Sequence, residues 1–130
     1  MNFLVAYNGS KQSTAALELA MQSAVKFGAK LFVMTSMEGG ADEKSEDITR
    51  VKESLKKVKE DLDASGLAYE VDELVRGLSP GEDLVEFAEE NEIDHIFVGV
   101  EKRSKTRKLL LGSTAQYIIL KAPCPVTTVK

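Results

Sequence analysis

Short apolar runs alternate along this 130-residue chain with longer segments of helical periodicity. Residues 3–6 and 31–35 are two such runs. A strand that is apolar along its length has to be covered on both faces, and this is the usual state of strands in parallel sheets. The alternation therefore predicts an α/β fold in which helices lie on both faces of a mostly parallel sheet.

The predicted elements alternate from a first strand to a last strand. Strands are predicted over residues 3–6, 31–35, 69–75, 94–100 and 126–129, and helices over 11–27, 43–65, 80–91 and 113–121. With right-handed crossovers, this order gives a doubly wound, five-stranded sheet. The run 69–75 places Glu70 and Asp72 on one side, so it is predicted to be an edge strand with one solvent-exposed face. Ligands of such sheets bind beyond the carboxyl ends of the strands, which directs attention to the turns 7–10 and 99–113.

Capping residues mark the helix boundaries. Ser10 can cap a helix that starts near Lys11, and Gly28 stands where a left-handed residue ends it. The run Ser79-Pro80-Gly81-Glu82 combines a serine cap, a proline at the first helical position and a glutamate three residues after the cap, so it predicts a capping box. The sheet-facing positions of the first helix are predicted to be Ala16, Leu17, Ala20, Ala24 and Val25.

A narrow apolar stripe follows the predicted helix over residues 43–65. Its members are Ile48, Val51, Leu55, Val58 and Leu62. The same spacing is typical of a coiled-coil seam, but these positions span only about two heptads, which is too short for a stable free coil. We therefore favour a helix that lies on the sheet.

Length and composition exclude several classes of protein. The chain has the size of one domain, residues 1–130, and no apolar run approaches the roughly 18 residues that a membrane helix needs. The sequence opens on a strand-like run without a signal-peptide pattern, so we expect a cytoplasmic protein. One cysteine and one histidine exclude an internal disulfide and a Cys/His zinc cluster.

Charge is unevenly distributed along the chain. The net charge is −4. Five positive charges nevertheless fall within seven residues, at Lys102, Arg103, Lys105, Arg107 and Lys108. The overall acidity makes nucleic acid an unlikely partner, and the basic stretch lacks the interleaved aromatic residues that stack on RNA bases.

The basic stretch leads into a possible anion site. No Walker-type loop and no G-x-G-x-x-G motif occurs, but Gly99 ends a predicted strand and Gly112-Ser113-Thr114 opens a helix. Free amides and the positive dipole end at a helix start favour phosphate, and the hydroxyls and upstream cations add to this. A solvated basic loop followed by an ordinary serine cap explains the same residues, and the sequence alone leaves both interpretations open.

Two motifs with this element order resemble the universal stress protein family. The first strand runs into Asn8-Gly9-Ser10 with Ser13 three residues on, and Gly99-Val100-Glu101-Lys102 is followed, nine residues later, by Gly112-Ser113. The chain closes with Pro123-Cys124-Pro125-Val126 before a last apolar strand, and the match extends over its whole length. The resemblance implies a flavodoxin-like, Rossmann-like fold and a family in which one branch binds ATP and another does not.

The resemblance also implies site residues. Adenine would lie against Ala6, Tyr7, Asn8 and Ser36, and ribose and phosphates against Gly99, Gly112, Ser113 and Thr114. Two residues depart from the family pattern, because Asn8 replaces an aspartate and Lys102 replaces the second glycine. Lys102, with Arg103, either contacts phosphate through its charge or obstructs the site.

We therefore expect a small cytoplasmic module that binds ATP or AMP and forms a homodimer through the edge strand Val126 to Val129. The alternative is a nucleotide-free dimeric interaction module of the same family. No residue set supports efficient catalysis, although weak ATP hydrolysis stays open. No metal-ligating residues are named, and whether a metal accompanies the nucleotide is left open. His95 is interpreted as a packed strand residue and Cys124 as an inert thiol.

Overall fold

The computed structural model describes residues 1–39, 45–101 and 111–130. In chain order its elements are β1 (Asn2–Ala6), α1 (Lys11–Phe27), β2 (Lys30–Met37), α2 (Ser45–Ser65), β3 (Tyr69–Val75), α3 (Pro80–Glu90), β4 (His95–Gly99), α4 (Ser113–Lys121) and β5 (Val126–Val129). The predicted order of strands and helices is confirmed, and residues 43 and 44 of the predicted second helix lie outside the described residues. No helix within the described ranges is both long and apolar enough to span a bilayer.

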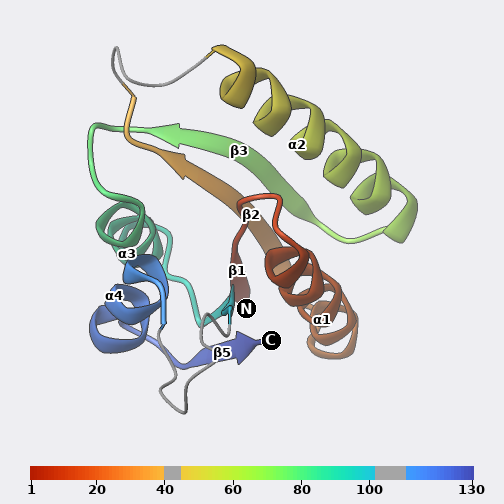
Figure 1. Cartoon of the computed structure of the whole chain (residues 1–130). Coiled ribbons are helices and arrows are strands. Elements are labelled where there is room, and N and C mark those ends of the chain that lie inside the picture. The colour runs from red at the N-terminus through yellow and green to blue at the C-terminus, as the bar shows by residue number, and fades with distance from the viewer. Residues whose placement is uncertain (40–44, 102–110) are drawn as a thin grey trace.

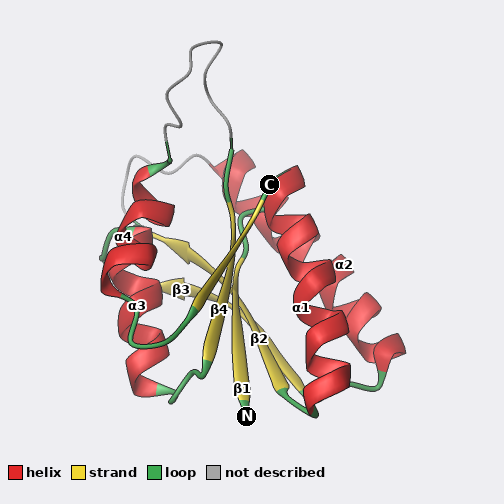
Figure 2. Ribbon diagram, turned by 90° about the horizontal axis from the view of Figure 1, so that it is seen from below, coloured by secondary structure: helices red, strands yellow, loops and turns green. Residues whose placement is uncertain are grey.

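The strands form one five-stranded sheet in the order β3-β2-β1-β4-β5, and all four pairs are parallel. Helices α1 and α2 cover one face, and α3 and α4 cover the other (Figures 1 and 2). The predicted doubly wound fold is therefore confirmed, with β3 at one edge as the alternation in its sequence indicated. The strand order reverses between β1 and β4, so their carboxyl ends form the switch point of the sheet.

Alternate residues of β1 bury their side chains in two separate cores. Phe3 and Val5 belong to the core under α1 and α2, whereas Leu4 and Ala6 belong to the core under α3 and α4. All four side chains are at most 8% exposed. Full burial of such aliphatic and aromatic groups stabilises the fold by roughly 1.5–3 kcal/mol for each large side chain. The central strand therefore joins both layers of helices.

Helix α1 begins and ends where its caps were predicted. The Ser10 hydroxyl accepts a hydrogen bond from the Ser13 amide at 3.1 Å, and Gly28 has a φ of 64°. The predicted burial of Val25 is wrong, because this side chain is 64% exposed. In this turn of the helix Ala24 faces the sheet. Val25 follows it and is rotated by about 100° around the helix axis, which turns its side chain toward solvent.

Two details differ from the sequence prediction at the carboxyl edge. Ser79 precedes α3 as predicted, but its side chain makes no capping hydrogen bond, so the predicted capping box is not formed. Proline at the first helical position and the backbone bond from Asp83 to Ser79, at 2.9 Å, start the helix instead. Strand β2 extends past the predicted end at Thr35, because Ser36 still pairs with β3.

The apolar stripe of α2 packs on the sheet, as favoured over a coiled-coil seam. Leu55, Val58 and Leu62 are buried in the core that α1 and α2 share, and Val51 is partly buried against it. The charged residues between them stay on the outer surface of the helix.

His95 lies in β4 as a half-buried strand residue. Its Nε2 is 2.6 Å from the Thr127 hydroxyl of β5, and its ring packs against Phe3 and Phe97. Burial lowers the pKa of this imidazole below its ordinary value of 6.5. The neutral ring is therefore the form that the folded chain prefers.

This pKa shift predicts a loss of stability in weak acid. Because the unfolded chain takes up a proton at its ordinary pKa before the folded chain does, the free energy of unfolding should decrease as the pH falls from 7.5 to 5.5. Urea unfolding at the two pH values measures the change, and His95→Gln should remove most of it. Equal stability at both values in the wild type would contradict the prediction.

Candidate functional site

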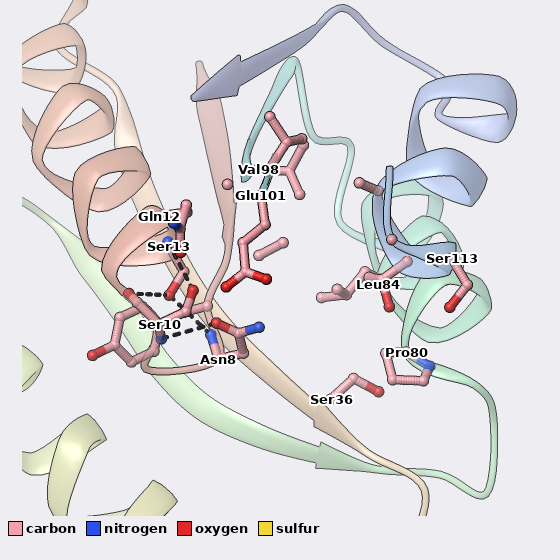
Figure 3. A pocket seen from close by; sticks show the side chains of 17 residues that line it. Asn8, Ser10, Gln12, Ser13, Ser36, Pro80, Leu84, Val98, Glu101 and Ser113 are labelled. Carbon is pink, nitrogen blue, oxygen red and sulfur yellow. Dashed lines mark hydrogen bonds between the residues drawn. The ribbon is translucent and has the colours of Figure 1, made fainter. Parts of the chain in front are cut away.

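A cavity of about 380 Å³ opens at the switch point of the sheet. The ends of β1 and β4 form its base, and the first turns of α1, α3 and α4 line its sides. Figure 3 shows the side chains that converge on it from these elements. A volume of this size falls in the range of small-molecule sites.

The structure brings most of the residues named from the sequence to this one cavity. Those in its lining are Ala6, Tyr7, Asn8, Ser36, Gly99, Gly112, Ser113 and Thr114. Lys102 and Arg103 lie outside the described residues. The residues come from four separate segments of the chain, and the parallel sheet is what places their ends at a common edge.

Sequence reasoning missed the part of the lining that comes from α3. Pro80 and Leu84 line the cavity from the first turn of that helix. The signal was present, because a helix that follows a parallel strand starts at the carboxyl edge of the sheet. The glycine motif gives Glu101 no role of its own, yet this residue lines the cavity and its carboxylate points into it (Figure 3).

A local hydrogen-bond network shapes the turn between β1 and α1. The Asn8 side-chain oxygen accepts from the Ser10 amide at 3.0 Å, and the Ser13 hydroxyl donates to the Ser10 carbonyl at 3.0 Å. The Asn8 amide donates in turn to the Ser13 hydroxyl at 3.4 Å. With its oxygen held in this way, Asn8 directs its side-chain nitrogen toward the cavity (Figure 3).

Gly99 allows β4 to touch the backbone of α1. A Cβ added at Gly99 would lie 2.6 Å from the Ser13 nitrogen and 2.7 Å from the Gln12 carbonyl oxygen. Both are backbone atoms, which cannot move aside as a flexible side chain can. The first glycine of the motif is therefore required by the packing of the fold itself.

Gly112 has a different environment at the start of α4. Its φ of −62° suits any residue, and a Cβ added there would meet no atom within 4 Å in the described part of the chain. The first backbone bond of α4 runs from the Gln116 amide to the Gly112 carbonyl at 3.0 Å, so the three preceding amides lie outside the helical ladder. With the hydroxyls of Ser113 and Thr114, this helix start can bind an anion.

Ser36 connects the cavity to an ion pair in which the Asp83 carboxylate is fully buried and the Arg76 side chain is partly exposed. Its hydroxyl donates to Oδ2 of Asp83 at 2.6 Å, and Oδ1 of Asp83 accepts from Nε of Arg76 at 2.5 Å. Arg76 also donates to Glu90 at 3.0 Å. Burial disfavours the guanidinium charge, but the hydrogen bonds to Asp83 and Glu90 outweigh it and raise the pKa of Arg76 above its usual value.

Metal-ligand clusters and the thiol of Cys124 are the other candidate reactive groups in the described ranges. These ranges hold no group of three or more His, Cys, Asp or Glu side chains that could bind a metal ion. Burial, together with the charge of Asp94, raises the pKa of the Cys124 thiol. A raised pKa keeps a thiol protonated and weakly nucleophilic at neutral pH.

Comparison with known proteins identifies relatives along the whole chain. The model of the universal stress protein family matches residues 1–130. A universal stress protein of Methanocaldococcus jannaschii is 33% identical over 134 residues, which cover 95% of this chain and 78% of the relative.

Solved structures agree with this match. A universal stress protein from Archaeoglobus fulgidus superposes with a TM-score of 0.87 at 34% identity and covers 100% of this chain and 93% of its own. A structure of the universal stress protein from the same organism in complex with dAMP gives a TM-score of 0.80 at 31% identity, covering 99% of this chain and 96% of its own. The resemblance drawn from the two sequence motifs is confirmed.

The different surroundings of the two glycines predict different mutational effects. Gly99→Ala forces a methyl group onto the backbone of α1 and should lower the free energy of unfolding by about 1–3 kcal/mol. Gly112→Ser adds a larger side chain in open space and a favourable capping residue, so it should change stability by less than about 0.5 kcal/mol. Urea unfolding of both variants measures this difference, and equal stabilities would contradict it.

Proposed function

The chain belongs to the universal stress protein family, and on that premise we propose that it is a small cytoplasmic module that binds an adenine nucleotide, ATP or AMP, in the cavity at the switch point. The observation that carries the proposal is the start of α4, where Gly112, Ser113 and Thr114 line the cavity and a Cβ added at Gly112 would meet no atom of the described residues within 4 Å. The A. fulgidus relative in complex with dAMP, 31% identical to this chain, supports the choice of an adenine nucleotide.

The lining divides into two parts of different chemistry. The start of α4 offers amides and hydroxyls, which suit phosphate oxygens. Ala6, Pro80 and Leu84 offer apolar surface, which suits the faces of an aromatic base. We assign the phosphates to α4 and the base to the surface between β1 and α3.

We propose that the basic stretch of the sequence contributes positive charge to the binding of phosphate. Glu101 brings a negative charge into the lining, and no lysine or arginine is among the described residues that surround the cavity. Lys102 and Arg103 follow Glu101 directly in the sequence. We assign to them the role of balancing the phosphate charge, with the metal requirement left to experiment.

Binding rather than turnover is the role that this lining supports. Glu101 is the one carboxylate among its described residues, which include no histidine, cysteine or lysine. The nucleotide would then act as a ligand that stabilises one state of the module.

Calorimetry with ATP and AMP tests the proposal. We expect a dissociation constant on the order of micromolar, equivalent to about −8 kcal/mol. Gly112→Asp should abolish binding because it places a carboxylate where the phosphates lie. Ala64→Asp adds the same charge at an exposed position of α2 and should bind as the wild type does. Absence of binding by the wild type at millimolar nucleotide would favour a nucleotide-free interaction module instead.

We also propose a homodimer through the exposed edge of β5. The Pro125 and Val129 carbonyls accept from β4, so the backbone groups of Val126 and Thr128 point to the open edge of the sheet. An unpaired strand edge of this kind readily pairs with a second copy.

Light scattering tests this edge. The wild type should have twice the 14.2 kDa mass of the chain. Thr128→Pro removes an outward amide and should yield monomers, whereas Thr128→Val keeps the amide and should leave the dimer intact. A monomeric wild type, or a Thr128→Pro variant that is still dimeric, would contradict the proposal.

A further inference from the structure

We infer that Ser36 acts as a fixed hydrogen-bond acceptor which selects a nucleotide base carrying an exocyclic amine, and that Asp83 is the residue that fixes it. This inference rests on the proposed nucleotide site and adds the basis of its selectivity. The observation behind it is the contact between the cavity-lining hydroxyl of Ser36 and the fully buried carboxylate of Asp83, 2.6 Å away.

The direction of this hydrogen bond is determined by Asp83. Oδ1 of Asp83 accepts from Nε of Arg76, and the same arginine donates through Nη2 to the Asp83 carbonyl at 2.9 Å. A carboxylate held in an ion pair has no proton to give, so the Ser36 hydroxyl must be the donor. Its hydrogen is committed to Asp83, and only the lone pairs of its oxygen are left for a ligand.

The arrangement resists reorientation. Asp83 is 0% exposed, so in the folded protein its Oδ2 is bonded to Ser36 and not to solvent, and loss of this bond would leave a buried acceptor unpaired. The bonds join the end of β2, the segment after β3 and the first turn of α3. In Figure 3 the Ser36 side chain points toward this turn, at Pro80.

An acceptor of fixed direction excludes phosphate from this part of the cavity. Phosphate oxygens also accept, so they gain nothing from Ser36, while the start of α4 offers them donors. Ala6, Pro80 and Leu84, which line the same cavity as Ser36, suit an aromatic ring better than a ribose. The ligand group opposite Ser36 is therefore an N–H donor on the base, and the 6-amino group of adenine is such a donor.

A double-mutant cycle between protein and ligand tests the inference. AMP is compared with purine riboside 5′-monophosphate, which lacks only the amino group, on the wild type and on Ser36→Ala. We expect the wild type to prefer AMP by about fivefold, the value of one hydrogen bond, and Ser36→Ala to bind both equally. Ser36→Thr keeps a hydroxyl and should retain the preference.

Two controls separate this role from a general effect on the cavity. Ser113→Ala removes a hydroxyl at the α4 start, so it should weaken both nucleotides and leave their ratio unchanged. In Asp83→Asn the new side-chain amide can donate to the Ser36 oxygen, which frees the hydroxyl hydrogen of Ser36 to turn toward the ligand. Provided that circular dichroism shows this variant to be folded, its preference for AMP should be smaller than that of the wild type.

The outcomes distinguish the selectivity from the nucleotide site itself. The same AMP preference in wild type and Ser36→Ala overturns the role of Ser36 while nucleotide binding stands. The role of Ser36 is also overturned if Ser36→Ala removes the difference in affinity between AMP and 2′-deoxy-AMP. In that case Ser36 contacts the ribose and not the base. Failure of the wild type to bind AMP overturns the nucleotide site and the selectivity together.

Discussion

The contact between Gly99 and the backbone of α1 is the constraint on which the cavity depends. The glycine lets the first turn of α1 lie directly against the end of β4, with the Ser13 nitrogen only 2.6 Å from where a Cβ would be. That turn is bonded to the residues after β1 through Ser10 and Ser13. The position of β4 therefore determines where Asn8 lies and how wide the switch point opens.

Buried charge organises the opposite wall. Arg76 and Asp83 form a pair whose carboxylate is fully buried and whose guanidinium is partly exposed, so loss of Arg76 would leave the buried charge of Asp83 without compensation, at a cost of up to about 3–5 kcal/mol. The exposed bond from Arg76 to Glu90 contributes little on its own. The network links the first turn of α3 to the end of β2. This link keeps Ser36 and Pro80 on one side of the cavity.

Short-range sequence patterns were enough to predict the strands and helices and the candidate site residues that lie at their ends. Apolar runs and caps located β1, α1 and β4, because burial on both faces and helix termination are properties of short segments. The exposure of Val25 and the absent Ser79 cap depend on neighbours that the pattern does not contain. The Ser36–Asp83 bond joins residues 47 positions apart, and no spacing rule in the sequence connects them.

The two glycines at the ends of the motif show why a sequence motif alone is ambiguous about function. Gly99 is explained without any ligand, since a side chain there would overlap the backbone of α1. Gly112 has ordinary dihedral angles and open space, so within the described chain neither strain nor packing requires a glycine. Under the proposed function, a glycine that the described part of the fold does not require, at a helix start that lines the cavity, is explained by the nucleotide that would bind there. If the proposed function holds, the part of the motif that concerns the ligand is its last glycine, whereas the first glycine is required by the packing of β4 on α1.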